Sequence, residues 1–108
     1  MLVDYNKHQS YSSTFEVQDL EPLADKWKAF GFEVREVDGH NVQELKSVLS
    51  GLPLSQNKPN AIICHTVKGK GVSFTEGNMH WHHKSNFKEA EIEKLLNGLE
   101  EYTCVKQA

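Results

Sequence analysis

The fold is decided by the stretch Ala61-Ile62-Ile63-Cys64-His65-Thr66-Val67, which runs directly into Lys68-Gly69-Lys70-Gly71. A nearly continuous apolar run of this length predicts a strand that is buried on both faces, as in a parallel sheet. Strand and helix patterns alternate before it, and this alternation predicts right-handed crossovers with helices on both faces of the sheet. The sequence therefore predicts an α/β protein with a buried parallel strand near residues 61–67.

The other elements follow from apolar periodicity and from residues that begin or end helices. The predicted order is β-α-β-α-β-α, with strands at residues 1–5, 32–37 and 61–67 and with helices carrying the apolar positions of residues 20–30, 42–52 and 92–102. Asp19 is placed to cap the first helix, and Asn41 with Glu44 forms a capping-box start for the second. The expected fold is one three-layer α/β/α domain over residues 1–108 with a partial parallel sheet.

The strand at residues 1–5 starts with apolar residues and has no leading loop. We therefore expect the chain to begin inside a strand, and we expect the sheet to be completed by other segments.

The composition and charge of the chain limit the classes of partner that it can bind. The chain has 108 residues, of which 38% are hydrophobic and 25% are charged, as in an ordinary folded domain. The net charge is -3 and the basic residues are scattered, so nucleic acid is not an expected partner. No apolar run approaches the roughly 18 residues that span a bilayer. We expect a cytoplasmic protein with no membrane contact.

Ligands of open parallel sheets bind beyond the carboxyl ends of the strands, so the polar segments at residues 4–10, 38–41 and 68–84 are candidate sites. In the last of them, Lys68-Gly69-Lys70-Gly71 combines glycines, whose backbone amides can approach an anion, with two ammonium groups. The spacing is neither that of a Walker loop nor that of a Rossmann fingerprint. A phosphate site and a plain exit turn with solvated lysines are both compatible with it.

Two further clusters could carry chemistry. Asp4 and Asn6 offer the hard oxygen ligands that Mg²⁺ prefers, although local backbone hydrogen bonds could equally satisfy them. His80, His82 and His83 have no cysteine or acidic partner at the spacing of a zinc site. A histidine beside lysines is better suited to a diphosphate oxygen, a substrate hydroxyl or proton transfer, with a surface histidine as the alternative.

Taken in order, these segments resemble the transketolase family, particularly its split bacterial form, whose cofactor-binding half is a separate chain. The resemblance covers nearly the whole chain and is carried by DYNKHQS (4–10), LEPLADKW (20–27), AFGFEV (29–34), EVDGHN (36–41), KP (58–59), AII (61–63), TVKGKGV (66–72) and WHHK (81–84). It implies a fragment of the thiamine diphosphate-binding fold. The implied reaction is transfer of a two-carbon ketol unit from a ketose to an aldose phosphate, with thiamine diphosphate and Mg²⁺ as cofactors.

The resemblance also implies roles for single residues. Asn6 and the backbone carbonyl of His8 would be metal ligands, and His82 would be the catalytic residue near the cofactor diphosphate and the substrate. The implied cofactor-binding residues are Asn6, His8, Lys68, Gly69, Gly71 and His82. The expected partners are sugar-phosphate substrates and the missing transketolase segments or a complementary subunit, in a homo- or hetero-oligomer.

Two departures from the family pattern are visible. The Gly-Asp-Gly segment that supplies another metal ligand is absent, so Asn6 and His8 would form half of a Mg²⁺ site and the 108 residues alone are expected to be inactive. The family usually has glycine where this chain has His83.

Two other functions stay open. One is a fragment of the deoxyxylulose-phosphate synthase branch, which the helix around Trp27 and the segment starting at Asp4 do not favour. The other is a non-catalytic α/β remnant that acts as an interaction or phosphate-binding module. The sequence does not specify the donor and acceptor sugars.

Overall fold

The computed structural model describes residues 1–107, with side chains described for residues 1–102. The chain divides into two compact units, Met1–Thr66 and Val67–Ala108. The first unit contains β1 (Leu2–Tyr5), α1 (Thr14–Val17), α2 (Leu23–Ala29), β2 (Glu33–Asp38), α3 (Val42–Ser50) and β3 (Asn60–His65). The second unit contains the 3-10 helix η1 (Met79–Trp81) and α4 (Glu89–Gln107).

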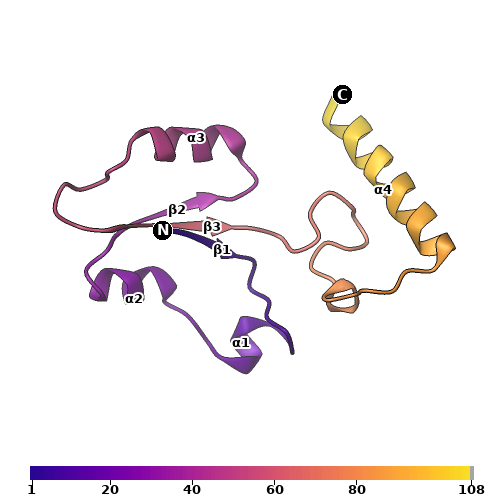
Figure 1. Ribbon diagram of the computed structural model, residues 1–108, viewed down its shortest axis with the longest axis horizontal. Coiled ribbons are helices and arrows are strands. Elements are labelled where there is room, and N and C mark those ends of the chain that lie inside the picture. Colours follow the sequence, from indigo (N-terminus) through magenta and orange to yellow (C-terminus); the bar gives the residue numbers. More distant parts are fainter. Residues whose placement is uncertain (108) are drawn as a thin grey trace. The chain divides into compact units, whose positions relative to one another are not determined.

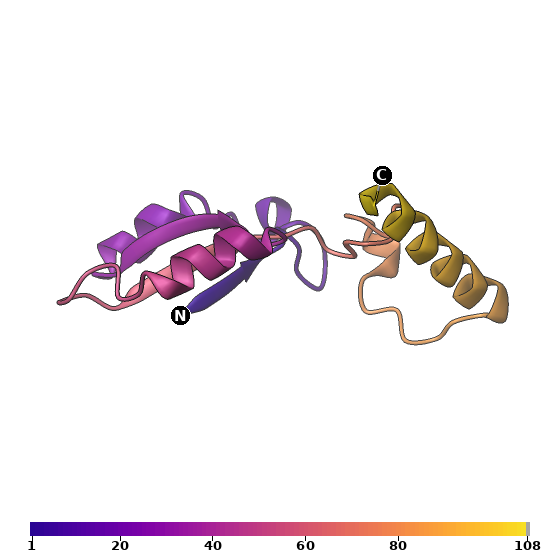
Figure 2. The same ribbon diagram turned by 90° about the horizontal axis from the view of Figure 1, so that it is seen from above.

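The sheet of the first unit is parallel, with the strand order β1-β3-β2. β3 is central because it pairs with both other strands, and its residues Ala61 to Cys64 are buried. α2 and α3 cover opposite faces of this sheet (Figure 1), and in the view from above α3 lies in front of the strands (Figure 2). The predicted α/β class with a partial parallel sheet is confirmed.

The core of the first unit lies between β3, β2 and α3. Val37, Ile62 and Cys64 form a buried cluster. Partly buried apolar residues pack against the cluster, namely Leu45, Val48 and Leu54. Burying a side chain such as that of Ile62 contributes about 1.5–3 kcal/mol relative to leaving it exposed. Leu45 and Val48 of the helix after Asn41 therefore face the sheet, whereas Val42, at the start of the same predicted apolar pattern, is 72% exposed.

The helix on the other face of the sheet, α2, contributes no fully buried residue. Trp27 of α2 packs edge-on against Phe32, with ring centroids 4.8 Å apart. Phe30, which directly follows α2, is 82% exposed. The periodic apolar pattern of this helix therefore extends to positions that this unit does not bury.

The structure corrects the predicted start of α2. The helix begins at Leu23, three residues after Leu20, and its cap position, Pro22, makes no side-chain cap hydrogen bond. The Asp19 carboxylate instead accepts a hydrogen bond from the Glu21 N–H at 3.0 Å, so the predicted Asp19 helix cap is wrong. A short carboxylate side chain that bonds to backbone two residues on forms a turn in competition with a cap.

The predicted capping box of α3 is half formed. The Asn41 side chain accepts a hydrogen bond from the Glu44 N–H at 3.1 Å, as expected. The Glu44 carboxylate does not return to Asn41 but accepts from the Asp38 N–H at 3.3 Å, which ties the helix start to the end of β2. One of the two bonds of the box is therefore replaced by a bond to the preceding strand.

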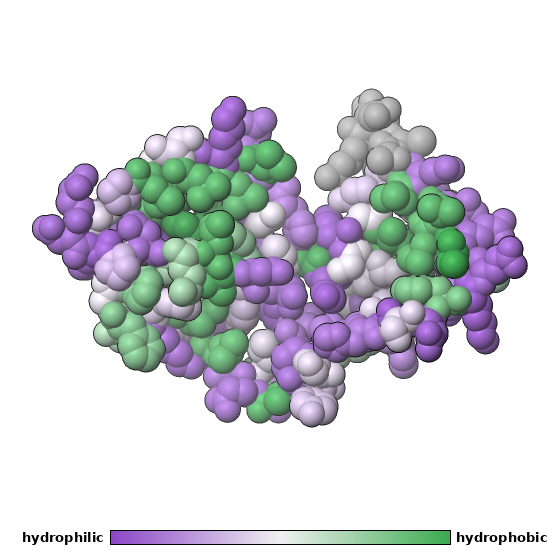
Figure 3. Space-filling view, in the orientation of Figure 1, coloured by the Kyte–Doolittle hydropathy of each residue, from purple (hydrophilic) through white to green (hydrophobic). Residues whose placement is uncertain are grey.

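Apolar surface gathers on the face of the first unit that is turned to the viewer in Figure 3. Large apolar side chains are exposed in both units, for example Leu2 at 58%, Val42 at 72% and Leu96 at 58%. Among the helices of the described residues, none combines the length and the apolar character that a membrane crossing requires.

Candidate functional site

The turn after β1 carries the two predicted metal ligands. The Asn6 side-chain oxygen Oδ1 accepts a hydrogen bond from the His8 N–H at 2.9 Å. The His8 ring Nδ1 lies 3.0 Å from the Asn6 carbonyl oxygen, which can only accept, so Nδ1 is the protonated ring nitrogen in this contact. Between them, Lys7 has a φ of 63°, a left-handed conformation that is uncommon for a side-chain-bearing residue. The structure thus brings Asn6 and His8 together.

The backbone of His8 is held by its neighbours. His8 forms an isolated antiparallel bridge with Ser13, and the hydrogen bonds of that bridge are Thr14 N–H to Lys7 oxygen at 2.9 Å and Gln9 N–H to Ser12 oxygen at 3.0 Å. Both bonds belong to residues beside the bridged pair, so the carbonyl of His8 is not used in this ladder. It remains positioned as a hard oxygen donor.

This donor set fits part of a Mg²⁺ site. An amide oxygen has two lone pairs, and one of those on Asn6 is used by the His8 N–H, so one remains. Octahedral Mg²⁺ needs more donors than Asn6 and the His8 carbonyl supply. In the part of the chain that the structure describes, there is no group of three or more His, Cys, Asp or Glu residues that could hold a metal ion.

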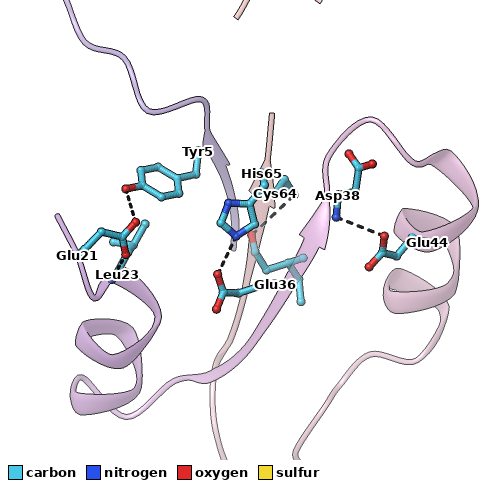
Figure 4. A network of polar contacts seen from close by, with 9 residues as sticks. Tyr5, Glu21, Leu23, Glu36, Asp38, Glu44, Cys64 and His65 are labelled. Carbon is cyan, nitrogen blue, oxygen red and sulfur yellow. Dashed lines mark hydrogen bonds and ion pairs between the residues drawn. The ribbon is translucent and has the colours of Figure 1, made fainter. Parts of the chain in front are cut away.

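Polar contacts fix the strand ends on which this turn stands (Figure 4). The Tyr5 hydroxyl donates to Glu21 at 2.8 Å, and the other oxygen of the Glu21 carboxylate accepts from the Leu23 N–H at 3.0 Å. These bonds, that of Leu23 first, lower the pKa of Glu21. Burial, and then the bond to Glu21, raise the pKa of the Tyr5 hydroxyl. The contacts join the end of β1 to the start of α2, sixteen residues further along the chain.

Two more contacts join β3 to its neighbours. His65 Nε2 lies 2.7 Å from the Glu36 carboxylate on β2 (Figure 4), and the Thr66 hydroxyl donates to the Asp4 carboxylate at the end of β1. Asp4, which the sequence offered as a possible metal ligand, is thus engaged within the sheet. The sequence did not predict these contacts of His65 and Thr66, because partners 29 and 62 residues apart leave no local pattern.

The second unit opens with the glycine-containing turn. Gly69 has a φ of +78° and Gly71 a φ of +108°, so both positions favour glycine. The Thr75 hydroxyl donates to the Gly69 oxygen at 2.8 Å, and the Gly77 N–H donates to the Lys68 oxygen at 2.8 Å. A Cβ on Gly69 would lie 2.5 Å from the Thr75 carbonyl oxygen. The turn is therefore folded closely onto the buried Thr75.

Part of this turn is already bound to an anion of the chain itself. The Gly71 N–H donates to the Glu76 carboxylate at 3.3 Å, and the Lys70 ammonium lies 3.3 Å from the same oxygen. The hydrogen bond that Lys70 donates to Glu76 is the main cause that raises the pKa of Lys70. The Lys68 side chain is exposed. Lys68 and Gly69, more than Lys70 and Gly71, are thus placed to receive a further anion.

His82 directly follows η1. The Asn78 side chain caps this short helix by accepting from the His80 N–H at 3.0 Å, and the His82 N–H donates to the Met79 oxygen at 3.0 Å. The His82 and His83 rings are 4.2 Å apart, edge to face. His83 has a φ of 57°, a left-handed backbone angle that favours glycine, which the resemblance described above implies for this position.

The residues after His82 are held by aromatic and charged contacts. The Lys84 ammonium lies 4.4 Å from the centre of the Trp81 ring and forms an ion pair with Glu91 of α4. That bond, followed by one from the Lys88 N–H, lowers the pKa of Glu91. The Trp81 ring also packs against Phe74, at 5.4 Å. Sequence reasoning missed this support of the His82 segment, although Lys84 belongs to the WHHK stretch.

The predicted site residues thus fall into two groups. Asn6 and His8 lie together in the first unit, and Lys68, Gly69, Gly71 and His82 belong to the second. Each group lies on a segment that follows the carboxyl end of a parallel strand, where ligands of such sheets bind.

Comparison with known proteins gives a consistent result. Residues 2–102 match the family described as transketolase, thiamine diphosphate binding domain. The chain is 44% identical over 97 residues to the 6-deoxy-6-sulfo-D-fructose transketolase subunit SqwG of Clostridium sp. (strain MSTE9), covering 84% of this chain and 35% of that protein. It is 39% identical over 82 residues to an apulose-4-phosphate transketolase subunit of Phocaeicola vulgatus, covering 76% and 29%.

A second apulose-4-phosphate transketolase subunit, from Actinobacillus succinogenes, is 38% identical over 98 residues, which cover 91% of this chain and 35% of that protein. The chain therefore spans about a third of the length of these curated relatives.

Proposed function

The chain belongs to the transketolase family, whose thiamine diphosphate-binding domain it matches over residues 2–102, and we propose that it is part of an enzyme that transfers a two-carbon ketol unit from a ketose to an aldose phosphate. The observation that carries the proposal is the arrangement of Asn6 and His8 at the carboxyl end of β1 in a chain of this family. When bound, thiamine diphosphate supplies the nucleophilic carbon of the reaction, and the protein supplies binding and orientation.

In this proposal the residues have separate tasks. The Asn6 side-chain oxygen and the His8 carbonyl bind Mg²⁺, which prefers such hard oxygen donors. The Lys68 ammonium and the Gly69 N–H bind diphosphate oxygens, and Gly71 contributes a conformation that only glycine adopts readily. The His82 imidazole holds or moves a proton at a substrate hydroxyl or at a diphosphate oxygen.

We further propose that the chain acts with other transketolase segments or with a complementary subunit. The three relatives described above are named as subunits, and the chain spans about a third of their length. Exposed apolar side chains in both units support an assembly with further protein. Because two oxygen donors do not complete a Mg²⁺ site, we expect no turnover by these 108 residues alone. Homo- or hetero-oligomeric state and cytoplasmic location stay predictions.

The metal assignment is tested by Asn6→Ala in the assembly that copurifies with the tagged chain. Ketol transfer from a ketose to an aldose phosphate is measured by mass spectrometry while Mg²⁺ is varied. The Mg²⁺ concentration for half-maximal rate should rise by about tenfold or more, since even an outer-shell partner of a metal contributes that much. Asn57→Ala, in the exposed connector before β3, is the matched control. An unchanged Mg²⁺ requirement in the Asn6 variant would count against this assignment.

The role of His82 is tested in the same assay. His82→Ala should lower kcat by about a hundredfold, the lower end of what a positioned acid or base contributes. His80→Ala removes an exposed imidazole two residues away and should leave kcat unchanged. Equal effects of the two variants would reject the catalytic assignment. If no assembly transfers a ketol unit or binds thiamine diphosphate, the non-catalytic alternative is the correct one.

A further inference from the structure

Glu76 is an acidic residue that the proposed reaction does not use, although it contacts the turn assigned to the cofactor diphosphate. Its carboxylate accepts from the Gly71 N–H at 3.3 Å and lies 3.3 Å from the Lys70 ammonium. A backbone N–H and an ammonium group are the donors that a phosphate oxygen takes in a glycine-containing turn. The carboxylate therefore makes the contacts that a phosphate group would make at Lys70 and Gly71.

The backbone on both sides of Glu76 is bonded to the turn. Thr75 is 7% exposed, and its hydroxyl donates to the Gly69 oxygen at 2.8 Å. The Gly77 N–H, on the other side of Glu76, donates to the Lys68 oxygen at 2.8 Å. Both backbone neighbours of Glu76 are thus bonded to the same turn. Its side chain meets Lys70 and Gly71 from an anchored segment.

The two halves of the turn therefore differ in charge. At Lys70 and Gly71 one positive charge is offset by one negative charge, and the N–H is directed at an oxygen. Lys68 is exposed and has no comparable carboxylate contact in the described residues. An anion that approaches Lys70 would meet the Glu76 carboxylate at contact distance, whereas one that approaches Lys68 would meet a weaker repulsion.

We propose that Glu76 is a positioning residue that confines an incoming diphosphate to the Lys68 and Gly69 half of the turn. The inference rests on the proposed function in that it assigns the turn to the cofactor diphosphate. It adds that the Lys70 ammonium and the Gly71 N–H bind the Glu76 carboxylate and not the cofactor. The register of the diphosphate along the turn then depends on a carboxylate that does not touch it.

The test uses the full chain labelled with ¹⁵N and inorganic pyrophosphate as the probe at physiological ionic strength. In the unsubstituted chain, pyrophosphate should shift the Gly69 amide signal and leave the Gly71 signal in place. In Glu76→Ala, both signals should shift, and the dissociation constant should fall by about threefold, the effect of removing one partly exposed like charge. Glu93→Ala removes an exposed carboxylate of α4 and should behave as the unsubstituted chain.

The outcomes separate this inference from the proposed function. Equal shifts of Gly69 and Gly71 in the unsubstituted chain, or a Gly71 signal that stays unmoved in Glu76→Ala while Gly69 shifts, overturn the inference alone. Absence of any shift in all three proteins overturns it together with the assignment of Lys68 to the diphosphate. In the assembly, Glu76→Ala should lower the KM for thiamine diphosphate and leave kcat nearly unchanged. A general loss of folding would not lower the KM.

Discussion

Replacing Gly69 by alanine measures how closely the turn after β3 is folded onto Thr75. Gly69 and Gly71 both have a positive φ, +78° and +108°, so alanine is strained at either position. Their surroundings differ. A Cβ on Gly69 would lie 2.5 Å from the Thr75 carbonyl oxygen and 2.9 Å from the Thr75 hydroxyl oxygen, whereas a Cβ on Gly71 would meet nothing within 4 Å. Gly71→Ala is therefore the matched control.

The expected magnitudes follow from these contacts. The left-handed backbone costs alanine about 1–2 kcal/mol at each position, and about 0.4–1 kcal/mol is offset by the stiffer unfolded chain. At Gly69 the overlap with Thr75 adds about 1–3 kcal/mol, and displacing the turn loses the Thr75 hydrogen bond, about 1 kcal/mol. Gly69→Ala should thus destabilise the second unit by about 2–4 kcal/mol more than Gly71→Ala.

The assay is urea unfolding followed by the fluorescence of Trp81, which lies in the second unit. Trp27 belongs to the first unit, so both alanine variants are made in a Trp27→Phe background to leave one reporter. The difference between the two midpoints, multiplied by the common slope, gives the difference in free energy of unfolding. Equal destabilisation by the two variants would refute the argument that Thr75 blocks a side chain at position 69.

Three other outcomes follow from the second unit. Thr75→Val should lower the free energy of unfolding by about 1–2 kcal/mol in the same urea assay because it removes the hydroxyl that lies within bonding distance of the Gly69 and Val72 carbonyl oxygens, and Thr75→Ser, which keeps the hydroxyl, should cost less. His83→Gly should stay within about 0.5 kcal/mol of the unsubstituted chain, since relief of the left-handed strain is offset by unfolded-state entropy, whereas His83→Val should be clearly destabilising. Lys84→Met should destabilise the unit more near neutral pH than in acid. The ion pair with Glu91, whose pKa is lowered, contributes above the ordinary value of 4.5 and is lost as pH falls through the folded-state pKa, whereas loss of the contact with the Trp81 ring is the same at both pH values; urea unfolding at several pH values measures the difference.

The parts of the fold that the sequence predicted are those with a local physical signal. β3 is recognisable because four consecutive positions are buried on both faces, and α3 is recognisable because Asn41 bonds to the Glu44 N–H three residues on. The short α1 has only four residues, too few for helical periodicity. The start of α2 was misplaced because Asp19 formed a turn with Glu21 where a cap was expected.

In the candidate site, too, only the features with a local sequence signal were predicted. The identities of Asn6, His8, Lys68 and His82 came from motif and family resemblance. The contacts that hold these residues in place could not be predicted in this way, because each contact depends on side-chain directions or on a partner far along the chain. The Tyr5 bond to Glu21 spans sixteen residues, and the Glu76 bond to Gly71 spans five residues of a loop with no periodic pattern. A lysine and a glycine in a turn do not show whether a neighbouring carboxylate already binds them.

The two groups of site residues are therefore held by different forces. The turn of Asn6 and His8 is held by backbone hydrogen bonds and by the Asn6 amide, none of which involves a net charge at neutral pH. The segment after His82 depends on the Lys84 ammonium, which pairs with Glu91 and lies over the Trp81 ring. Salt screens such a partly exposed ion pair and leaves neutral backbone bonds nearly unaffected. Raising ionic strength should thus alter the environment of His82 before it alters that of Asn6, and loss of order at both residues together would show that the two segments are not held independently.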